Sequence, residues 1–306
     1  MRLIGEKEIR QSIGLPESIA AMRQAVIAQS RGECDTPMPM HLYLAADRAG
    51  EVHIKSSYRK GGGHFVLKMA GSFPERPYGM VLLVSSVTGK TEAYFDDGGY
   101  LTDLRTAAVS AMVAKELGRT DPVLGILGTG VQARLQARLH AEVMDLEEVF
   151  FWGRDPEHAA ACARDVAALL PRVRVSVAES PADVASKSLL IVTATAAREP
   201  LLRVRDLRPG SHVSAVGADS PGKRELSAEI LRRASLLLVD SLAQCEKLGE
   251  LQHVLSEKRR AVEIGAFCER PVPFDRSGIT VADFTGLGAE DLFIAEACHE
   301  KIRADV

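Results

Sequence analysis

The chain has 306 residues, of which 46% are hydrophobic and 26% charged, and its formal net charge is −3 at pH 7. This length allows two domains of ordinary size, and the lack of a basic tail or stripe argues against nucleic acid as a partner. No apolar run approaches the roughly 18 residues of a membrane helix, and the charged first residues do not resemble a signal peptide, so we expect neither a membrane segment nor export.

The first hundred residues predict one helix followed by short strands. The helix covers residues 15–28, where Pro16 opens a run with apolar residues at helical spacing. Short apolar runs between turn signals then predict strands at 41–45, 51–56, 65–69, 80–85 and 92–95. These strands are expected to form an antiparallel or mixed sheet, because no helices separate them.

From residue 101 onward the sequence predicts one long helix and then an alternation of strands and helices. An alanine-rich helix is predicted over 101–117, with Thr102 or Asp103 as its N-cap and Gly118 at its end. Strands are then predicted at 123–127, 148–152, 173–177, 189–193, 212–215 and 236–239. Helices are predicted between or after them at 132–144, 156–170, 181–185 and 227–234. Such alternation predicts a doubly wound parallel sheet.

The end of the chain returns to a helical pattern after Ile279, with a helix predicted at 289–303. This last helix is expected to pack back onto the first domain. The predicted division is therefore a substrate domain of residues 1–118 joined by 283–306, and a dinucleotide-binding domain of residues 119–282.

A glycine-rich turn follows the predicted strand at 123–127. Gly128 and Gly130 stand in the pattern Gly-x-Gly-x-x-Ala, which ends at Ala133 and opens a helix. In a strand–turn–helix context these glycines permit a tight turn and leave room for a pyrophosphate at the helix N-terminus. The turn therefore predicts a Rossmann-type dinucleotide site, although an ordinary α/β turn can show the same glycines.

Two cations precede this turn at positions where a solvated charge is unexpected. Lys68 interrupts an apolar strand, where a lysine is costly unless it is paired or functional. The alternative is an outward-facing position on a half-exposed strand. Arg105 stands near the start of a helix, where it opposes the helix dipole, and its planar fork suits a carboxylate or phosphate. The alternative is a surface arginine paired with Asp103.

Two further candidates follow predicted parallel strands, where open α/β sheets bind their ligands. Asp219 comes after the strand at 212–215 and is a candidate general acid or base; the alternative is a turn residue before Pro221. Arg154 follows the strand at 148–152 and suits the 2′-phosphate of NADP. The adjacent Asp155 suits the 2′-hydroxyl of NAD, so we favour NADP only weakly.

Other kinds of site find no support in the sequence. The eight histidines show neither His-x-x-x-His nor His-Glu-x-x-His spacing, so no metal site is predicted. No Gly-x-Ser-x-Gly elbow indicates a serine hydrolase. The five scattered cysteines contain no Cys-x-x-Cys pair, which is typical of a reducing compartment, so a cytoplasmic location is expected.

The order and spacing of these residues resemble those of the ornithine cyclodeaminase/mu-crystallin family. The resemblance covers nearly the whole chain, from the first helix to the residues before the last one. The motifs that carry it are Lys68 in its strand, Leu104-Arg105-Thr106-Ala107-Ala108, Gly128-Thr129-Gly130-Val131-Gln132-Ala133, Val216-Gly217-Ala218-Asp219-Ser220-Pro221-Gly222-Lys223 and Asp283-Phe284-Thr285-Gly286-Leu287-Gly288.

The resemblance implies a homodimer, with an N-terminal α+β substrate and dimerisation domain completed by the C-terminal helix, and a Rossmann domain for NAD or NADP. It implies that Asp219 and Lys68 are catalytic. Candidate substrate-binding residues under the same resemblance are Lys68, Arg105 and Thr285. Candidate cofactor-binding residues are Arg105, Gly128, Gly130, Val131, Gln132, Arg154, Thr195, Val216 and Lys223.

Members of this family interconvert amino acids and imines, so the resemblance implies an NAD(P)-dependent oxidoreductase acting on a small amino acid or its ketimine. The alternative is a redox-neutral cyclodeaminase that converts ornithine to proline, and a non-enzymatic nucleotide-binding protein ranks third. Ornithine fits less well, because no arginine in residues 37–43 matches the one expected upstream of Lys68. Glu51 is the one match we find for the glutamate that neighbours ornithine, and Lys55 adds a cation near it.

Overall fold

The computed structural model describes residues 1–44, 50–73 and 77–304, which form two compact units. One unit consists of Met1–Ala108 together with Leu287–Val306, and the other of Val109–Gly286. The chain passes from the first unit to the second within α3 (Tyr100–Glu116) and returns after Gly286.

The first unit contains a mixed β-sheet, as the sequence predicts. Its strands are β1 (Arg2–Gly5), β2 (Cys34–Asp35), β3 (Met40–Tyr43), β4 (Glu51–Arg59), β5 (His64–Ser72), β6 (Tyr78–Ser85) and β7 (Thr91–Asp96). They lie in the order β1-β7-β6-β5-β4-β2, and β3 also pairs with β4. The β1–β7 pair is parallel and the others are antiparallel.

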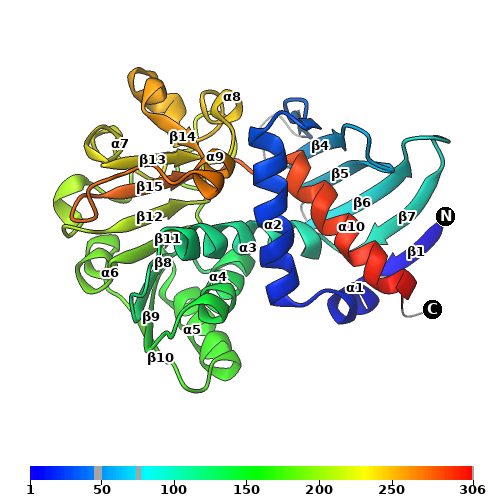
Figure 1. Cartoon of the computed structure of the whole chain (residues 1–306). Helices are drawn as coiled ribbons and strands as arrows, with labels where there is room; N and C mark the ends of the chain where they lie inside the picture. Colours follow the sequence, from blue (N-terminus) through cyan, green and yellow to red (C-terminus); the bar gives the residue numbers. More distant parts are fainter. Residues whose placement is uncertain (45–49, 74–76, 305–306) are drawn as a thin grey trace. The chain divides into compact units, whose positions relative to one another are not determined.

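Three helices accompany this sheet: α1 (Glu6–Ser12), α2 (Leu15–Ser30) and α10 (Gly288–Ala304). Figure 1 shows α10, in red, beside α2, in blue, and α10 also packs on β4 and β5. A Cβ atom on Gly288 would lie 2.3 Å from the Ser56 carbonyl oxygen, so only glycine allows this close approach. The predicted packing of the last helix onto the N-terminal sheet is therefore confirmed.

The second unit is a doubly wound parallel sheet, which confirms the predicted fold class (Figure 1). Its strands are β8 (Val123–Leu127), β9 (Glu148–Trp152), β10 (Arg174–Val177), β11 (Leu190–Thr193), β12 (His212–Ala215), β13 (Leu236–Val239), β14 (Ala261–Glu263) and β15 (Thr280–Asp283). The strand order is β10-β9-β8-β11-β12-β15-β13-β14. The order reverses direction between β8 and β11, and ligands bind at such a switch point in open α/β sheets.

The crossover helices of this unit are short and bury one face each. They are α4 (Val131–Val143), α5 (Pro156–Leu169), α6 (Pro181–Lys187), α7 (Ala228–Arg233), α8 (Leu242–Cys245) and α9 (Ile264–Glu269), with single 3₁₀ turns at Val204–Asp206, Glu250–His253 and Leu255–Arg259. Strands β11, β12, β13 and β15 are buried along their whole length, because helices cover both faces of the sheet.

Some sequence predictions were wrong. The chain after Ile279 first forms β15 and only then a helix, because a short, fully buried strand and a buried helix share the same continuous apolar pattern. Neither Thr102 nor Asp103 caps α3: the Asp97 carboxylate accepts hydrogen bonds from the N–H groups of Gly99 and Leu101. The strand predicted at 41–45 ends at Tyr43, and residue 45 lies outside the described residues.

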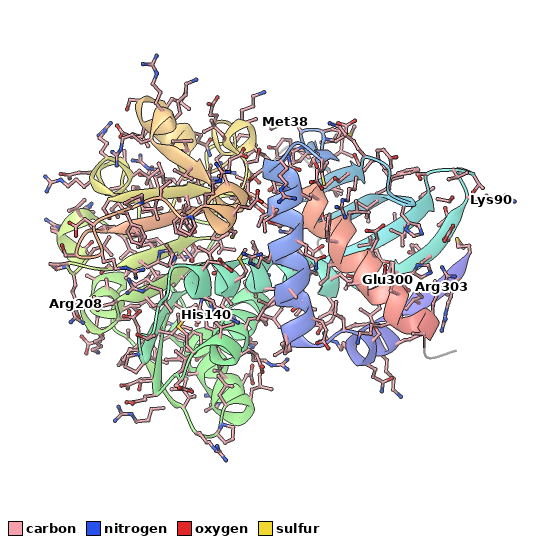
Figure 2. The ribbon with its side chains drawn as sticks, in the orientation of Figure 1. Met38, Lys90, His140, Arg208, Glu300 and Arg303 are labelled. Carbon is pink, nitrogen blue, oxygen red and sulfur yellow. The ribbon has the colours of Figure 1, made fainter. Side chains whose placement is uncertain are left out.

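Among the described residues, none of the helices is both long and apolar enough to cross a membrane. Charged side chains such as Lys90 and Arg208 project from the surface (Figure 2), as expected for solvated residues. The exceptions are buried charges, among them Lys68, Arg105, Glu225 and Asp291, which lie at the sites described below.

Candidate functional site

A cavity of about 420 Å³ lies at the carboxyl ends of β8, β9 and β11, in the second unit. It occupies the switch point of the parallel sheet, where the strand order reverses. Its lining residues are Gly128, Thr129, Trp152, Gly153, Arg154, Ala194, Thr195, Ala196, Ala197, Arg198 and Leu201. The structure therefore brings the predicted cofactor residues Gly128, Arg154 and Thr195 to one cavity.

The glycine turn has the shape that a pyrophosphate site needs. Gly128 has a φ of 132°, and a Cβ there would lie 2.5 Å from the Ala194 carbonyl oxygen, so no other residue fits. At Gly130 a Cβ would meet no atom within 4 Å, which leaves open space in front of helix α4. No side chain caps this helix, Val131 and Gln132 lie in its first turn, and the N-terminus of a helix favours an anion.

A buried glutamate holds the loops that surround this cavity. Glu225 accepts hydrogen bonds from the Thr193 hydroxyl, from the N–H and hydroxyl of Thr195, and from the N–H of Gly217. Burial raises the pKa of Glu225, and these hydrogen bonds oppose that change by stabilising its carboxylate form. One side chain therefore ties together the ends of β11 and β12 and fixes Thr195 at the cavity wall.

The charges that follow β9 have separate roles in the structure. Arg154 lines the cavity together with Arg198. The Asp155 carboxylate instead caps α5, because it accepts hydrogen bonds from the N–H groups of Glu157 (2.8 Å) and His158 (3.2 Å). These bonds lower the pKa of Asp155. Arg154 and Asp155 are neighbours in the sequence, but Arg154 lines the cavity and Asp155 caps a helix.

Asp219 lies in the loop that follows β12, as the sequence predicts for a residue at the ligand-binding edge. Its Oδ1 accepts a hydrogen bond from the Lys223 ammonium at 2.6 Å and one from the Ser220 hydroxyl at 3.1 Å. The Asp219 side chain is 35% exposed and that of Lys223 17%. The ion pair joins two predicted site residues in one contact.

Two other predicted residues are buried in the framework of this unit. Val216 follows β12, and its N–H donates to the Thr193 carbonyl oxygen. The Thr285 hydroxyl lies 2.9 Å from Asp240 Oδ1, and Gln244 donates a hydrogen bond to the Thr285 oxygen at 2.9 Å. The Thr285 side chain therefore belongs to a buried polar network.

The first unit contains a cluster of buried charges around Lys68. Lys68 lies on β5, directly opposite Lys55 of β4, and both side chains are almost completely buried. The Lys68 ammonium lies 3.4 Å from Asp291 Oδ2 on α10. The face of the sheet that carries both lysines is therefore the one that α10 covers, and Lys68 is not an outward-facing surface residue.

Arg105 extends from α3 to the same carboxylates. Its Nε donates to Asp291 Oδ1 at 3.0 Å, and its Nη1 donates to Glu290 Oε2 at 2.9 Å. Arg105 is 4% exposed, so the alternative of a surface arginine is excluded. The structure brings Lys68 and Arg105 together through Asp291, which contacts both cations.

Burial and charge act against each other within this cluster. Burial lowers the pKa of the Lys68 ammonium, and the nearby Asp291 carboxylate partly offsets that effect. Burial alone raises the pKa of Asp291, but the charges of Lys68, Arg105 and Lys55 outweigh it, so the pKa of Asp291 lies below its usual value. The cluster therefore favours the charged form of the aspartate.

Sequence reasoning missed Glu290 and Asp291, the two carboxylates that hold these cations. They stand in the first turn of α10, where acidic residues are common simply because they suit the helix dipole. The signal in the sequence was that these two adjacent acidic residues precede the mostly apolar run of a helix that is buried along most of its length. Only the packing of α10 on the sheet shows what they contact.

Comparisons with known proteins agree with this architecture. A model of the ornithine cyclodeaminase/mu-crystallin family matches residues 4–305. The chain is 34% identical to the uncharacterized cyclodeaminase y4tK of Sinorhizobium fredii, over 98% of this chain and 96% of that protein. It is 29% identical to the alanine dehydrogenase of Archaeoglobus fulgidus, over 97% and 94%. The iminosuccinate reductase of Paracoccus denitrificans in complex with NAD⁺ has a TM-score of 0.88 at 27% identity, covering 100% of this chain and 97% of that one.

Proposed function

The chain belongs to the ornithine cyclodeaminase/mu-crystallin family, and from that membership we propose that it is an NAD(P)-dependent oxidoreductase acting on a small amino acid or its imine. The observation that carries the proposal is the buried cluster in which Lys55, Lys68 and Arg105 accompany two carboxylates, Glu290 and Asp291. Buried cations of this kind, and the planar guanidinium of Arg105 in particular, suit the carboxylate of an amino acid. Alanine dehydrogenase and iminosuccinate reductase, both similar to this chain, are named for substrates of this kind.

Within this proposal each group of residues has a defined task. A bound nicotinamide supplies or accepts the hydride. The open space at Gly130 and the uncapped first turn of α4 hold the pyrophosphate, and Thr195 contacts the cofactor from the cavity wall. Lys68 and Arg105 hold the substrate carboxylate.

Proton transfer falls to the pair formed by Asp219 and Lys223. The Asp219 carboxylate accepts a proton from the substrate nitrogen during oxidation, and the protonated carboxyl group returns it during reduction. The Lys223 ammonium, 2.6 Å from Asp219 Oδ1, orients the carboxylate and favours its charged form, which promotes return of the proton. Thr285 is already bonded to Asp240 and Gln244, so we assign it the task of fixing the backbone that leads into α10.

A redox-neutral cyclodeaminase is the second candidate, supported by the cyclodeaminase names of several similar proteins. The placement of Lys55 argues against ornithine as its substrate. Because Lys55 lies directly opposite Lys68 in a buried part of the sheet, a second ammonium on the substrate meets repulsion there. Glu51, the candidate partner for that ammonium, contacts His41 and His53 instead.

A panel of amino acids and their imines, assayed separately with NADH and NADPH, tests the proposed reaction. We expect a net change in the nicotinamide absorbance band with at least one imine or neutral amino acid. Release of ammonia from a diamino acid without net absorbance change would establish the lyase instead. Cofactor binding without turnover on any member of the panel would leave a nucleotide-binding role.

We also propose that NADP is preferred over NAD. Arg154 and Arg198 line the cavity, whereas Asp155, the residue that would repel a 2′-phosphate, is engaged as the cap of α5. Trp152, the one tryptophan in the sequence, also lines the cavity, so its fluorescence reports binding of either cofactor.

Arg154→Ala should weaken NADPH binding by about 10- to 100-fold, the loss expected for one charged hydrogen bond, and change NADH binding little. The matched control is Arg172→Ala, because Arg172 is exposed and lies away from the cavity lining. Tighter binding of NADH than NADPH by the unaltered protein would contradict the proposed preference.

We propose a homodimer formed through the N-terminal sheet. The face of this sheet opposite Lys68 carries apolar side chains that remain largely exposed in the single chain, among them Met40 (57%), Leu42 (42%) and Leu67 (40%). An exposed apolar sheet face of this kind is typical of a protein–protein interface. Light scattering should report a dimer at micromolar concentration, and Leu67→Lys should shift it toward monomer; a stable monomer of the unaltered chain would contradict the proposal.

A reducing, cytoplasmic compartment is the location that we propose. All five cysteines lie within the described residues, where each is buried and no disulfide joins any two of them. Fractionation of the source cells should recover the protein with the cytoplasmic enzymes, and recovery outside the cytoplasm would contradict this location.

A further inference from the structure

Two histidines and a glutamate converge on the N-terminal sheet, on the same face as the buried charges around Lys68. His41 of β3 and His53 of β4 are direct partners in the antiparallel register, so their side chains project from the same face. Their ring centroids lie 4.4 Å apart. Glu51 stands two residues before His53 on the same strand and therefore points to the same side.

The nitrogen and oxygen atoms of this trio have the separations of ligands around one small cation. His53 Nε2 lies 3.0 Å from Glu51 Oε1, and His41 Nδ1 lies 3.6 Å from the same oxygen. One ligand atom from each residue falls within 4.8 Å of the others. Ligands bound tetrahedrally to Zn²⁺ at about 2.0–2.1 Å lie about 3.3–3.4 Å from one another, and the two measured contacts bracket that separation.

His41 lacks the hydrogen bonds that a buried imidazole normally makes. Within the part of the chain that the structure describes, neither of its ring nitrogens has a hydrogen-bond partner, although both atoms are shielded from solvent. A buried polar atom without a partner is costly, and a bound metal ion removes that cost. The side chains of His41, Glu51 and His53 remain 12–17% exposed, which leaves a route for an ion to enter.

A second cluster with similar composition does not share these properties. His64 lies between two carboxylates, with Nδ1 3.0 Å from Glu296 and Nε2 3.2 Å from Glu92. Both ring nitrogens of His64 are therefore already engaged by carboxylates, unlike those of His41. His299 contacts His64 edge-on at a centroid distance of 5.9 Å. The His64 cluster is therefore a satisfied polar network.

The charges around the trio also permit a cation. Lys55 lies two residues beyond His53 on the same face of β4, so its charge opposes a cation there, whereas the Glu51 carboxylate within the trio favours one. Two neutral imidazoles and one carboxylate give the trio a single negative charge. That is the usual composition of a site for Zn²⁺ or a related first-row metal with one position left for water or a small ligand.

We propose that His41, Glu51 and His53 form a binding site for one divalent transition-metal ion, with Zn²⁺ as the expected occupant. The sequence predicts no metal site because the usual helical spacings of histidine are absent; here the antiparallel pairing of β3 with β4 joins ligands twelve residues apart. The proposal does not depend on the proposed oxidoreductase activity.

Calorimetric titration of the chelator-treated full chain with ZnCl₂ tests the site. We expect one equivalent per chain with micromolar or tighter affinity. His41→Ala and His53→Ala should each weaken binding by more than the roughly 10- to 100-fold that loss of an outer-shell partner costs. Glu51→Gln should weaken it less, since an amide oxygen remains as a ligand.

His158→Ala and His64→Gln are the controls, because His158 lies on the surface and His64 belongs to the other cluster. Both should bind Zn²⁺ as the unaltered chain does, and circular dichroism of the ion-free variants should confirm their fold. Replacing Zn²⁺ with Co²⁺ should give the visible absorption of a four-coordinate site without sulfur-to-metal charge transfer. Equal binding by the His41 and His53 variants, loss of binding in His64→Gln, or a sulfur-ligated spectrum would overturn the proposal.

Discussion

Asp291→Asn should destabilise the first unit strongly, because it removes the carboxylate that two buried cations share. In the structure Asp291 lies 3.0 Å from Arg105 Nε and 3.4 Å from Lys68 Nζ, and all three side chains are at most 4% exposed. Removing one partner of a buried ion pair typically costs about 3–5 kcal/mol, since the remaining charge stays buried without compensation. Arg105 keeps Glu290, so most of the loss falls on Lys68.

Deprotonation of Lys68 sets an upper limit to this cost. The ordinary lysine pKa is 10.5, so releasing the proton at pH 7 costs about 5 kcal/mol, which agrees with the range above. The pH dependence follows from the same linkage. Without Asp291 the pKa of folded Lys68 falls further below its unfolded value, so the folded variant binds fewer protons than the folded parent. The free energy of unfolding of the variant therefore rises more with pH than that of the parent, and the difference in stability between the two proteins becomes smaller as pH rises.

Urea denaturation followed by far-ultraviolet circular dichroism at pH 7 and pH 9 measures both effects. We expect a loss of about 3–5 kcal/mol at pH 7 and a clearly smaller loss at pH 9. Lys68→Met combined with Asp291→Asn should restore much of the stability, because no unpaired ammonium remains. The matched control is Glu229→Gln, which removes an exposed pair with Arg233 and should cost less than about 1 kcal/mol. A loss below about 1 kcal/mol for Asp291→Asn, or one that does not change with pH, would refute this reasoning.

Three further predictions concern the second unit. Gly130→Val should abolish dinucleotide binding, measured through Trp152 fluorescence, while the fold persists, because the new Cβ meets no protein atom within 4 Å; unchanged affinity would remove the phosphate assignment. Asp219→Asn should lower turnover by about 10²- to 10⁴-fold with nearly unchanged cofactor affinity, and near-normal turnover would reduce Asp219 to a turn residue. Burial lowers the pKa of His140 to about 4, so between pH 6.5 and pH 4 the unfolded chain binds a proton at this residue and the folded chain does not. The free energy of unfolding of the unaltered protein, measured relative to that of His140→Gln, should therefore fall by about 3 kcal/mol over this range. This comparison cancels the opposite contribution of buried Asp283, whose pKa burial raises to about 7; a constant difference across that range would contradict a neutral, buried His140.

Much of the fold follows from patterns that are local in the sequence. Alternating strands and helices between β8 and β13 predict the parallel sheet. Each crossover helix returns the chain to the end of the sheet where the preceding strand began, so the next strand runs in the same direction. The glycine turn is equally local: Gly128 adopts a positive φ that only glycine tolerates easily, and the helix that follows begins at Val131. The order of motifs around these elements is also sufficient to identify the family.

The candidate site depended more on tertiary structure. The sequence marks Lys68 and Arg105 as unusual cations, but their partner Asp291 lies about two hundred residues further along the chain. Asp155 and Arg154 are neighbours in sequence, and only the start of α5 shows that Asp155 serves as its cap. Such contacts are invisible in the sequence because charge type does not reveal which distant element will cover a side chain.

The sequence by itself therefore determined the class of fold, the position of the glycine turn and the family, and it supplied candidates for the residues that carry the chemistry. Tertiary structure decided which charges are paired, that β15 is a strand before α10 begins, and that His41 faces His53 across two antiparallel strands. The reason is physical. Backbone propensity and apolar periodicity act over a few residues, whereas pairing, burial and desolvation depend on groups that approach one another only when the chain is folded.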